Sequence, residues 1–209
     1  MTSAVRPHAA YDQTNLQHVL RRAGQLGLLE AVCVLAFSLV SRFLDGAPEL
    51  ALRSLIVLAG VAATTLLPGL WTRARTVEGI AGSAGIGLGA AALFTVVDAI
   101  ALQPLGTYTN RWLAIGGGSN WWHLPVWWMV GTFLPWMGAY ALANQTAKHG
   151  APSPVGVLMT ALVLTGICGA VAVAISFPGA SLGLGTFSVA FLPAIALTVL
   201  VTGLGGKRG

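Results

Sequence analysis

Six long apolar stretches, each separated from the next by a short polar or turn-forming segment, dominate the amino-acid sequence. They cover residues 24–44, 50–71, 80–102, 123–143, 155–177 and 185–204. Each stretch is long enough to cross about 30 Å of hydrocarbon as an α-helix, which takes roughly 20 residues. The pattern predicts an all-α, polytopic membrane bundle of about six transmembrane helices, forming a single domain over residues 1–209.

The residues before the first apolar stretch, 1–23, are polar and allow two interpretations. Asp12 or Thr14 is placed to cap a short helix on which Leu16 and Leu20 would share an apolar face. Such an amphipathic helix would lie along the membrane surface. Alternatively, the same residues extend the first transmembrane helix beyond the membrane. Both interpretations leave residues 1–23 as a cytoplasmic N-terminal segment.

The composition is not that of a water-exposed domain. Charged residues make up 8% of the chain and hydrophobic residues 56%, whereas soluble domains are about a quarter charged. A soluble enzyme, a nucleic-acid-binding domain and a disulfide scaffold are therefore not expected, and the net charge of +5 is too scattered to follow a phosphate backbone. Cys33 and Cys168 lie in apolar stretches, where we expect small buried hydrophobes and neither a disulfide nor a metal site.

The few basic residues predict the orientation in the membrane, because Lys and Arg collect in cytoplasmic loops. With the N-terminus in the cytoplasm, eight of the 11 basic residues fall on that side, namely Arg6, Arg21, Arg22, Arg73, Arg75, Lys148, Lys207 and Arg208. The three on the outer side are Arg42, Arg53 and Arg111. This bias favours six spans with both termini cytoplasmic, in the inner (cytoplasmic) membrane of a bacterium.

Tryptophans gather in the outward-facing loop 103–122 and in the apolar stretch that follows it. The cluster comprises Trp112, Trp121, Trp122, Trp127, Trp128 and Trp136. Indole rings sit well at the membrane–water boundary, because the ring is apolar while its N–H needs a polar partner. Anchoring and helix packing are the simplest interpretation. The alternatives are a gated substrate pocket and a flat surface for a pigment, a quinone or a partner helix, formed by Trp121, Trp122, Trp127 and Trp128.

His123 lies at the start of the fourth apolar stretch, next to Trp122. A neutral imidazole can serve as an axial ligand of haem iron or of the magnesium in a chlorophyll-type ring. The other histidines offer no partner at similar depth, because His8 and His18 precede the first stretch and His149 lies in a predicted cytoplasmic loop. The remaining interpretations are a single axial ligand and, more simply, a hydrogen bond at the membrane surface.

Two acidic residues fall within the predicted spans, where a charge is costly and marks a candidate functional position. Glu30 is about two helical turns from Arg22. It either pairs with this arginine, faces a proton or cation path, or contacts a neighbouring subunit. Asp98 lies near the outer end of the third stretch, where we expect an outer ion network. The arginines predicted for that network are Arg42, Arg53 and Arg111.

Small residues recur every four positions in the third stretch, at Ala81, Gly85 and Gly89. Such stripes let two membrane helices approach closely, because apolar burial alone provides little driving force in lipid. The stripe predicts a close neighbour for this helix, without indicating whether the neighbour belongs to the same chain.

Reactive motifs are scarce, which favours a non-catalytic role. The sequence contains neither an H-E-x-x-H nor a G-x-S-x-G motif. We therefore expect a non-catalytic integral subunit that packs against other membrane subunits and lipids in a larger bacterial complex. A photosynthetic or respiratory complex would be a natural host, and the aromatic outer edge would help to hold a pigment, a quinone or a lipid.

Two alternatives remain open at the level of sequence. The first is a small carrier or channel for a neutral or weakly polar solute, with Glu30 and Asp98 as coupling residues. The second is an enzyme that modifies a lipid or an isoprenoid, with His123 and Asp98 near an outer-face site. This enzyme would need a divalent metal or a second base that the sequence does not reveal.

Overall fold

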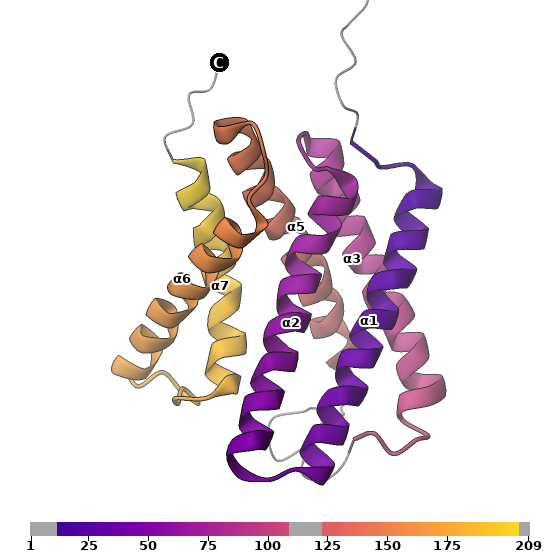
Figure 1. The fold of residues 1–209 in the computed structure, drawn as a ribbon, viewed down its shortest axis with the longest axis vertical. Helices are drawn as coiled ribbons and strands as arrows, with labels where there is room; N and C mark the ends of the chain where they lie inside the picture. Colours follow the sequence, from indigo (N-terminus) through magenta and orange to yellow (C-terminus); the bar gives the residue numbers. More distant parts are fainter. Residues whose placement is uncertain (1–11, 109–122, 205–209) are drawn as a thin grey trace, which may run out of the picture.

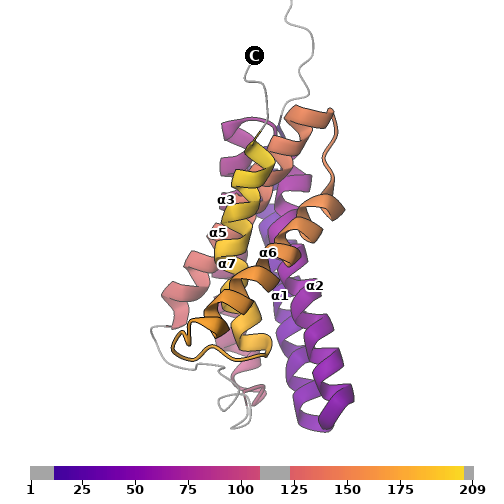
Figure 2. The same cartoon turned by 90° about the vertical axis from the view of Figure 1, so that its left-hand side faces the viewer.

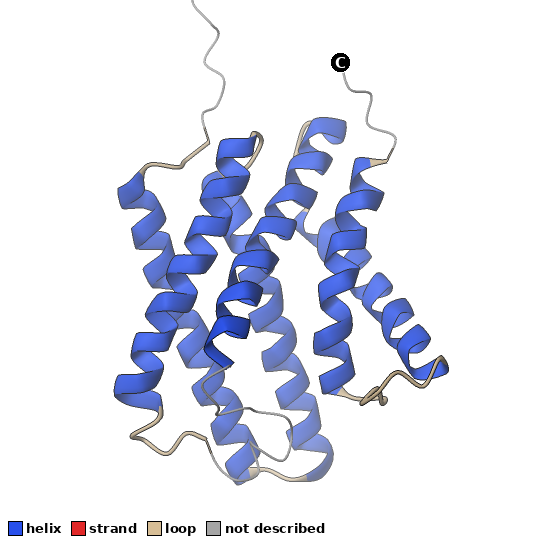
Figure 3. Ribbon diagram, turned by 180° about the vertical axis from the view of Figure 1, so that it is seen from behind, coloured by secondary structure: helices blue, strands red, loops and turns tan. Residues whose placement is uncertain are grey.

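The chain folds into long α-helices, in agreement with the apolar pattern. A computed structural model describes residues 12–108 and 123–204, and no strand occurs among them (Figure 3). Its helices are α1 Leu16–Phe43, α2 Gly46–Thr72, α3 Val77–Val97, the short π-helix η1 Asp98–Leu102, α5 His123–His149, α6 Pro154–Ala174 and α7 Leu184–Gly203.

Most of these helices are long and apolar enough to cross a membrane. Five spans meet this criterion: α1, α2, α3 continued by η1, α6 and α7. Helix α5 has 27 residues and lies in the same bundle, although it is not among these five spans. The chain is therefore a polytopic membrane protein, and the predicted number of about six spans fits the structure.

Successive helices run antiparallel, so α1 begins and α7 ends at the same end of the bundle (Figure 1). We call this the terminal end, and the opposite end, where α1 is followed by α2, the distal end. An even number of crossings explains the arrangement. The positive-inside pattern then predicts that the terminal end faces the cytoplasm. The basic residues near this end are Arg21, Arg22, Arg73, Arg75 and Lys148.

Helix α5 lies at the centre of the packing. It contacts α2 and α3 on one side and α7 on the other, while α1 packs against α2 and α3. Helix α6 packs mainly on α7 and crosses it at an angle on the outside of the bundle (Figure 2). Helices α2 and α7 thus share α5 as a neighbour without packing closely on each other.

Helix α1 is continuous from Leu16 to Phe43, which decides between the two interpretations of the N-terminal segment. Residues 16–23 extend the first span and form no separate surface helix, while residues 1–11 lie outside the described part. Asn15 is the N-cap, and its side chain accepts a hydrogen bond of 2.7 Å from the His18 N–H. The predicted cap, Asp12 or Thr14, was therefore wrong for this helix.

Asp12 instead caps a different helix. Its carboxylate accepts hydrogen bonds from the backbone N–H groups of Arg75 (3.1 Å), Thr76 (3.0 Å) and Gly79 (3.0 Å), and from the Thr76 hydroxyl (2.5 Å). These donors surround the N-terminus of α3, where unpaired N–H groups and the helix dipole favour an anion. The segment before α1 is thereby tied to the turn between α2 and α3.

Glycines allow the helix backbones to approach closely around α5. A Cβ atom at Gly138 of α5 would lie 1.8 Å from the carbonyl oxygen of Thr65 in α2. A Cβ atom at Gly87 of α3 would lie 2.1 Å from the carbonyl oxygen of Gly131 in α5. Both distances are far too short for a real contact, so the missing side chains set how closely α2 and α3 approach α5.

The small-residue stripe of α3 faces α1 of the same chain. A Cβ atom at Gly89 would lie 2.9 Å from the Ala23 Cβ, and one at Gly85 would lie 3.9 Å from Val19 Cγ1. The neighbour of this stripe is thus an intramolecular helix, which leaves these glycines no role in contact with another subunit.

We expect Gly138→Ala to destabilise the fold by about 1–3 kcal/mol, because the added methyl group overpacks the α2–α5 contact. Gly166→Ala on α6 is the matched control, since a Cβ atom there meets nothing within 4 Å. Thermal unfolding of both variants in the same mild detergent measures the difference. Equal midpoints for the two variants would contradict the close approach of α2 to α5.

We expect Asp12→Ala to destabilise the protein by about 1–3 kcal/mol, because it leaves several donors at the start of α3 without their charged acceptor. Arg75→Ala is the control, since Arg75 contributes only its backbone N–H to this cap. Hydrogen exchange at residues 75–79 locates the effect. Faster exchange in the Arg75 variant and no change in the Asp12 variant would show that Asp12 does not cap α3.

Candidate functional site

A large cleft lies in the distal half of the bundle, between α1, α2, α3, α5 and α7. Its volume is about 600 Å³ and most of its lining atoms are apolar, within the usual range for small-molecule sites. It is a cleft and not a sealed void. The residues that we use to define it are Glu30, Cys33, Phe37, Arg53, Gly60, Thr64, Phe94, Trp127, Ser188 and Phe191.

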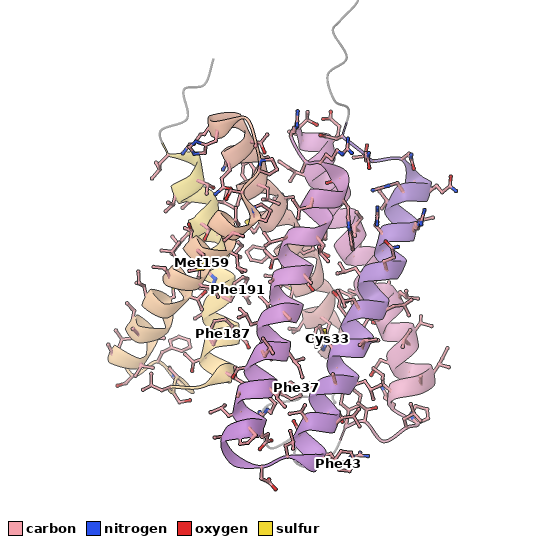
Figure 4. All side chains as sticks on the ribbon, viewed as in Figure 1. Cys33, Phe37, Phe43, Met159, Phe187 and Phe191 are labelled. Carbon is pink, nitrogen blue, oxygen red and sulfur yellow. The ribbon has the colours of Figure 1, made fainter. Side chains whose placement is uncertain are left out.

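The helices present these residues at helical spacing. On α1, Glu30, Cys33 and Phe37 follow one another along one face toward the distal end. Figure 4 shows Cys33 and Phe37 on α1, with Phe191 and Phe187 on α7 across the front helix α2. Phe94 of α3 and Trp127 of α5 line the cleft as a tilted ring pair, with their centroids 5.5 Å apart.

Glu30 supplies the carboxyl group of the cleft. It is partly buried, and its Oε1 accepts a hydrogen bond of 3.3 Å from the Thr64 hydroxyl of α2. The predicted partner, Arg22, is engaged elsewhere: it donates to Gln25 Oε1 at 2.8 Å, and its guanidinium lies 5.0 Å from the centre of the Trp71 ring. The expected Glu30–Arg22 pair is therefore not formed.

Arg53 lies in the cleft toward the distal end, and its charge is balanced. Its Nη1 donates to Glu49 Oε1 at 3.0 Å, one helical turn earlier on α2. Its guanidinium also lies 4.9 Å from the centre of the Phe37 ring. Stacking on an aromatic face together with an ion pair lets a guanidinium remain away from bulk water.

Asp98 forms a separate polar cluster at the end of α3 and does not line the cleft. Its carboxylate accepts hydrogen bonds from Gln103 Nε2 at 2.7 Å and from the Tyr108 hydroxyl. Burial, reinforced by the hydrogen bond and the charge of Asp98, raises the pKa of Tyr108 well above its usual value. Tyr108 thus remains a neutral donor to Asp98 across the physiological pH range.

The expected ion network around Asp98 is not present among the described residues. Arg42 donates instead to the Gly106 carbonyl oxygen at 2.6 Å, and Arg53 pairs with Glu49. Ser38 donates to the Thr107 carbonyl oxygen at 2.5 Å, which fastens the same loop to α1. Neutral donors and a backbone carbonyl therefore replace the charge pairs predicted for Asp98 and Arg42, whereas the ion pair that the four-residue spacing of Glu49 and Arg53 predicts is formed. Arg111 lies outside the described part.

The predicted aromatic surface is only partly visible. Trp121 and Trp122 lie outside the described residues, and so does the side chain of His123, whose backbone begins α5. Trp127 lines the cleft, whereas the half-exposed Trp128 donates from Nε1 to Thr95 Oγ1 at 3.2 Å. Trp127 and Trp128 thus lie in different surroundings and form no common flat surface.

Sequence reasoning missed most of the cleft. Arg53 and Phe37 were not predicted to meet, and Thr64 and Phe94 were not singled out. A helical spacing from Arg53 through Gly60 to Thr64 on α2 was available as a signal. It does not reveal the cleft, because the apposition of five helices is needed to define it.

The cleft offers polar groups that can bind a molecule. Within residues 12–108 and 123–204, no group of three or more His, Cys, Asp or Glu side chains could hold a metal ion. Cys33 and Cys168 are both free thiols. The carboxyl of Glu30 and the hydroxyl of Thr64, set in an apolar wall, can orient a bound molecule.

Comparisons with known proteins identify no relative. No family model matches the chain, and it matches neither a curated protein nor a solved structure. The geometry of the cleft is therefore the basis on which a function is assigned.

Proposed function

We propose that this protein is a non-catalytic integral membrane subunit that holds a lipophilic molecule in the cleft. The observation that carries the proposal is the open cleft of about 600 Å³ lined mainly by apolar side chains of five helices. A helical bundle that binds no ligand would fill such a volume with its own side chains, because empty space loses dispersion contacts. A bound apolar molecule restores those contacts.

The shape of the bundle gives such a molecule a route from the membrane. Helices α2 and α7 border the cleft and both pack on α5, but they do not pack closely on each other. A molecule dissolved in the lipid would enter between them without crossing water. A pigment, a quinone with an isoprenoid tail and a membrane lipid all have the required apolar body.

We further propose that the protein works in a larger complex of the bacterial cytoplasmic membrane, a photosynthetic or a respiratory one, together with other membrane subunits and with no nucleic acid. The outer side of α6 supports this proposal. Its residues Val155, Met159, Val163, Ile167 and Val171 recur every four positions and are more than half exposed. They form a continuous apolar face on which lipid or another membrane helix would pack.

A carrier for a weakly polar solute is the second candidate function. Glu30 supports it, because a carboxyl group in a membrane cleft could take part in coupled transport. Asp98 does not strengthen this candidate, since it bonds to Tyr108 and Gln103 outside the cleft. We therefore place it after the binding role.

We expect Gly60→Leu to reduce the amount of bound lipophilic molecule. A Cβ atom at Gly60 would lie 3.8 Å from Cys33 Sγ, an ordinary contact, so the backbone tolerates the change while the longer side chain fills the cleft. Gly166→Leu is the control, since it adds the same side chain to open space on α6. Solvent extracts of the purified proteins, analysed by mass spectrometry and absorption, measure the bound molecule.

A molecule present in equal amounts in the wild type and both leucine variants would be ordinary bound lipid, and the proposed binding role of the cleft would be wrong. A visible spectrum lost only in the Gly60 variant identifies a pigment. An ultraviolet quinone band or a single lipid species lost only there identifies the other two classes.

We expect affinity purification in mild detergent to recover the chain with other integral membrane proteins in fixed ratio. Contacts along the exposed face of α6 would hold them, so Val163→Trp should release the partners while leaving the molecule in the cleft. Recovery of the monodisperse chain alone, from the wild type, would contradict the role as a subunit and favour the carrier.

A further inference from the structure

The cleft contains one carboxyl group, that of Glu30, for which no described residue provides a cationic partner. Its charged lining residues are Glu30 and Arg53, and Arg53 is already paired with Glu49 at 3.0 Å. Glu30 forms no ion pair with any described residue, and its observed partner is the neutral hydroxyl of Thr64. An acidic side chain at membrane depth normally has a cationic partner or faces a pathway.

The nearest basic side chain on the same helix does not serve as that partner. Arg22 is held by Gln25 and by the face of Trp71, toward the terminal end. Moving it to Glu30 would break both contacts. The carboxyl of Glu30 is therefore available to a molecule that enters the cleft.

The walls around the cleft suit an apolar cation. Phe94 and Trp127 form a tilted pair with centroids 5.5 Å apart, and Phe191 lines the cleft from α7. Aromatic faces attract cations through the ring quadrupole, and this attraction is stronger where water is excluded. An anion would meet the carboxyl of Glu30 and the negative faces of these rings, while Arg53, the cation of the lining, is paired with Glu49.

We infer that the cleft is a site for a lipophilic organic cation, whose positive centre pairs with Glu30 and whose apolar groups lie against the aromatic wall. The inference rests on the proposed binding role and adds the charge of the ligand. The cation would supply the Glu30 carboxylate with a partner of opposite charge, as Glu49 does for Arg53. The occupant is thus distinguished from a neutral lipid chain, which the apolar walls alone would also accept.

The test uses two probes of nearly the same size and shape but opposite charge, tetraphenylphosphonium and tetraphenylborate. Saturable binding to the full-length protein in lipid nanodiscs is measured by equilibrium dialysis, with empty nanodiscs as background. We expect the phosphonium to bind with an affinity about tenfold or more above that of the borate, and Glu30→Gln to lower phosphonium affinity about tenfold to a hundredfold.

Three further variants test whether the charge of Glu30, and not a change in the fold, determines phosphonium binding. Glu30→Asp keeps the charge and should retain most of the preference for the cation. Asp98→Asn removes an acid that bonds to Gln103 and Tyr108 outside the cleft, so it should leave phosphonium binding unchanged. Gly60→Leu should abolish phosphonium binding by filling the cleft, and thermal unfolding of each variant shows that the bundle is intact.

Equal affinity for the two probes, with both lost in Gly60→Leu, would overturn the cation inference while leaving the proposed binding of a lipophilic molecule in place. Phosphonium binding that survives both Glu30→Gln and Gly60→Leu would lie outside the cleft and would also overturn the inference. Absence of binding by either probe, in a wild-type protein whose extract still contains a cleft-dependent molecule, would rule out the cation without ruling out the binding role.

Discussion

The close approach of helix backbones to α5 is the constraint on which the rest of the bundle depends. At Gly138 the backbone of α5 lies against the Thr65 carbonyl of α2, and at Gly131 it lies against Gly87 of α3. In lipid, where burial of apolar side chains gives little net driving force, such contacts supply the dispersion energy that holds helices together. With α2 and α3 fixed on one side of α5 and α7 on the other, the distal half of the bundle retains a space that no side chain fills.

Three charged side chains at or near the cleft, its neighbouring helices and the end of α3 have close polar or aromatic partners, whereas Glu30 has no charged partner. Arg53 has Glu49 and the Phe37 ring, Arg22 has Gln25 and Trp71, and Asp98 has Gln103 and Tyr108. These contacts lower the cost of the charged groups, because an unpaired charge is expensive at membrane depth. Glu30 has only a hydroxyl, and it faces the cleft.

The apolar pattern predicted the class of fold and the approximate helices, because these follow from lengths and composition, and the distribution of Lys and Arg predicted an even number of crossings. The helices nevertheless extend beyond the predicted stretches, and the extension is greatest where α1 begins at Leu16, where α2 begins at Gly46, and where α5 continues to His149. In these extensions, polar side chains form hydrogen bonds with neighbouring helices. Asn144 of α5, for example, donates to the Val199 carbonyl oxygen of α7 at 3.1 Å.

The candidate site was less accessible to sequence reasoning. Glu30 was singled out by its cost in a membrane, but its expected partner was wrong, because Glu30 bonds to Thr64 of α2 while Arg22 contacts Gln25 and Trp71. Asp12 was assigned to the wrong helix, since its contact lies more than 60 residues away in sequence. Long-range apposition of this kind depends on how helices rotate and tilt, which no local pattern encodes.

The position of α7 has a consequence for how the binding site comes into being. Helix α7 supplies one wall of the cleft and is the last described helix to leave the ribosome, paired with α6 as a hairpin on the outside of the bundle. During synthesis, α1, α2, α3 and α5 can therefore assemble around their glycine contacts while the cleft is still an open groove. Insertion of the final hairpin completes the cleft, so the lipophilic molecule proposed to bind there would meet an open groove during biogenesis and the opening between α2 and α7 afterwards.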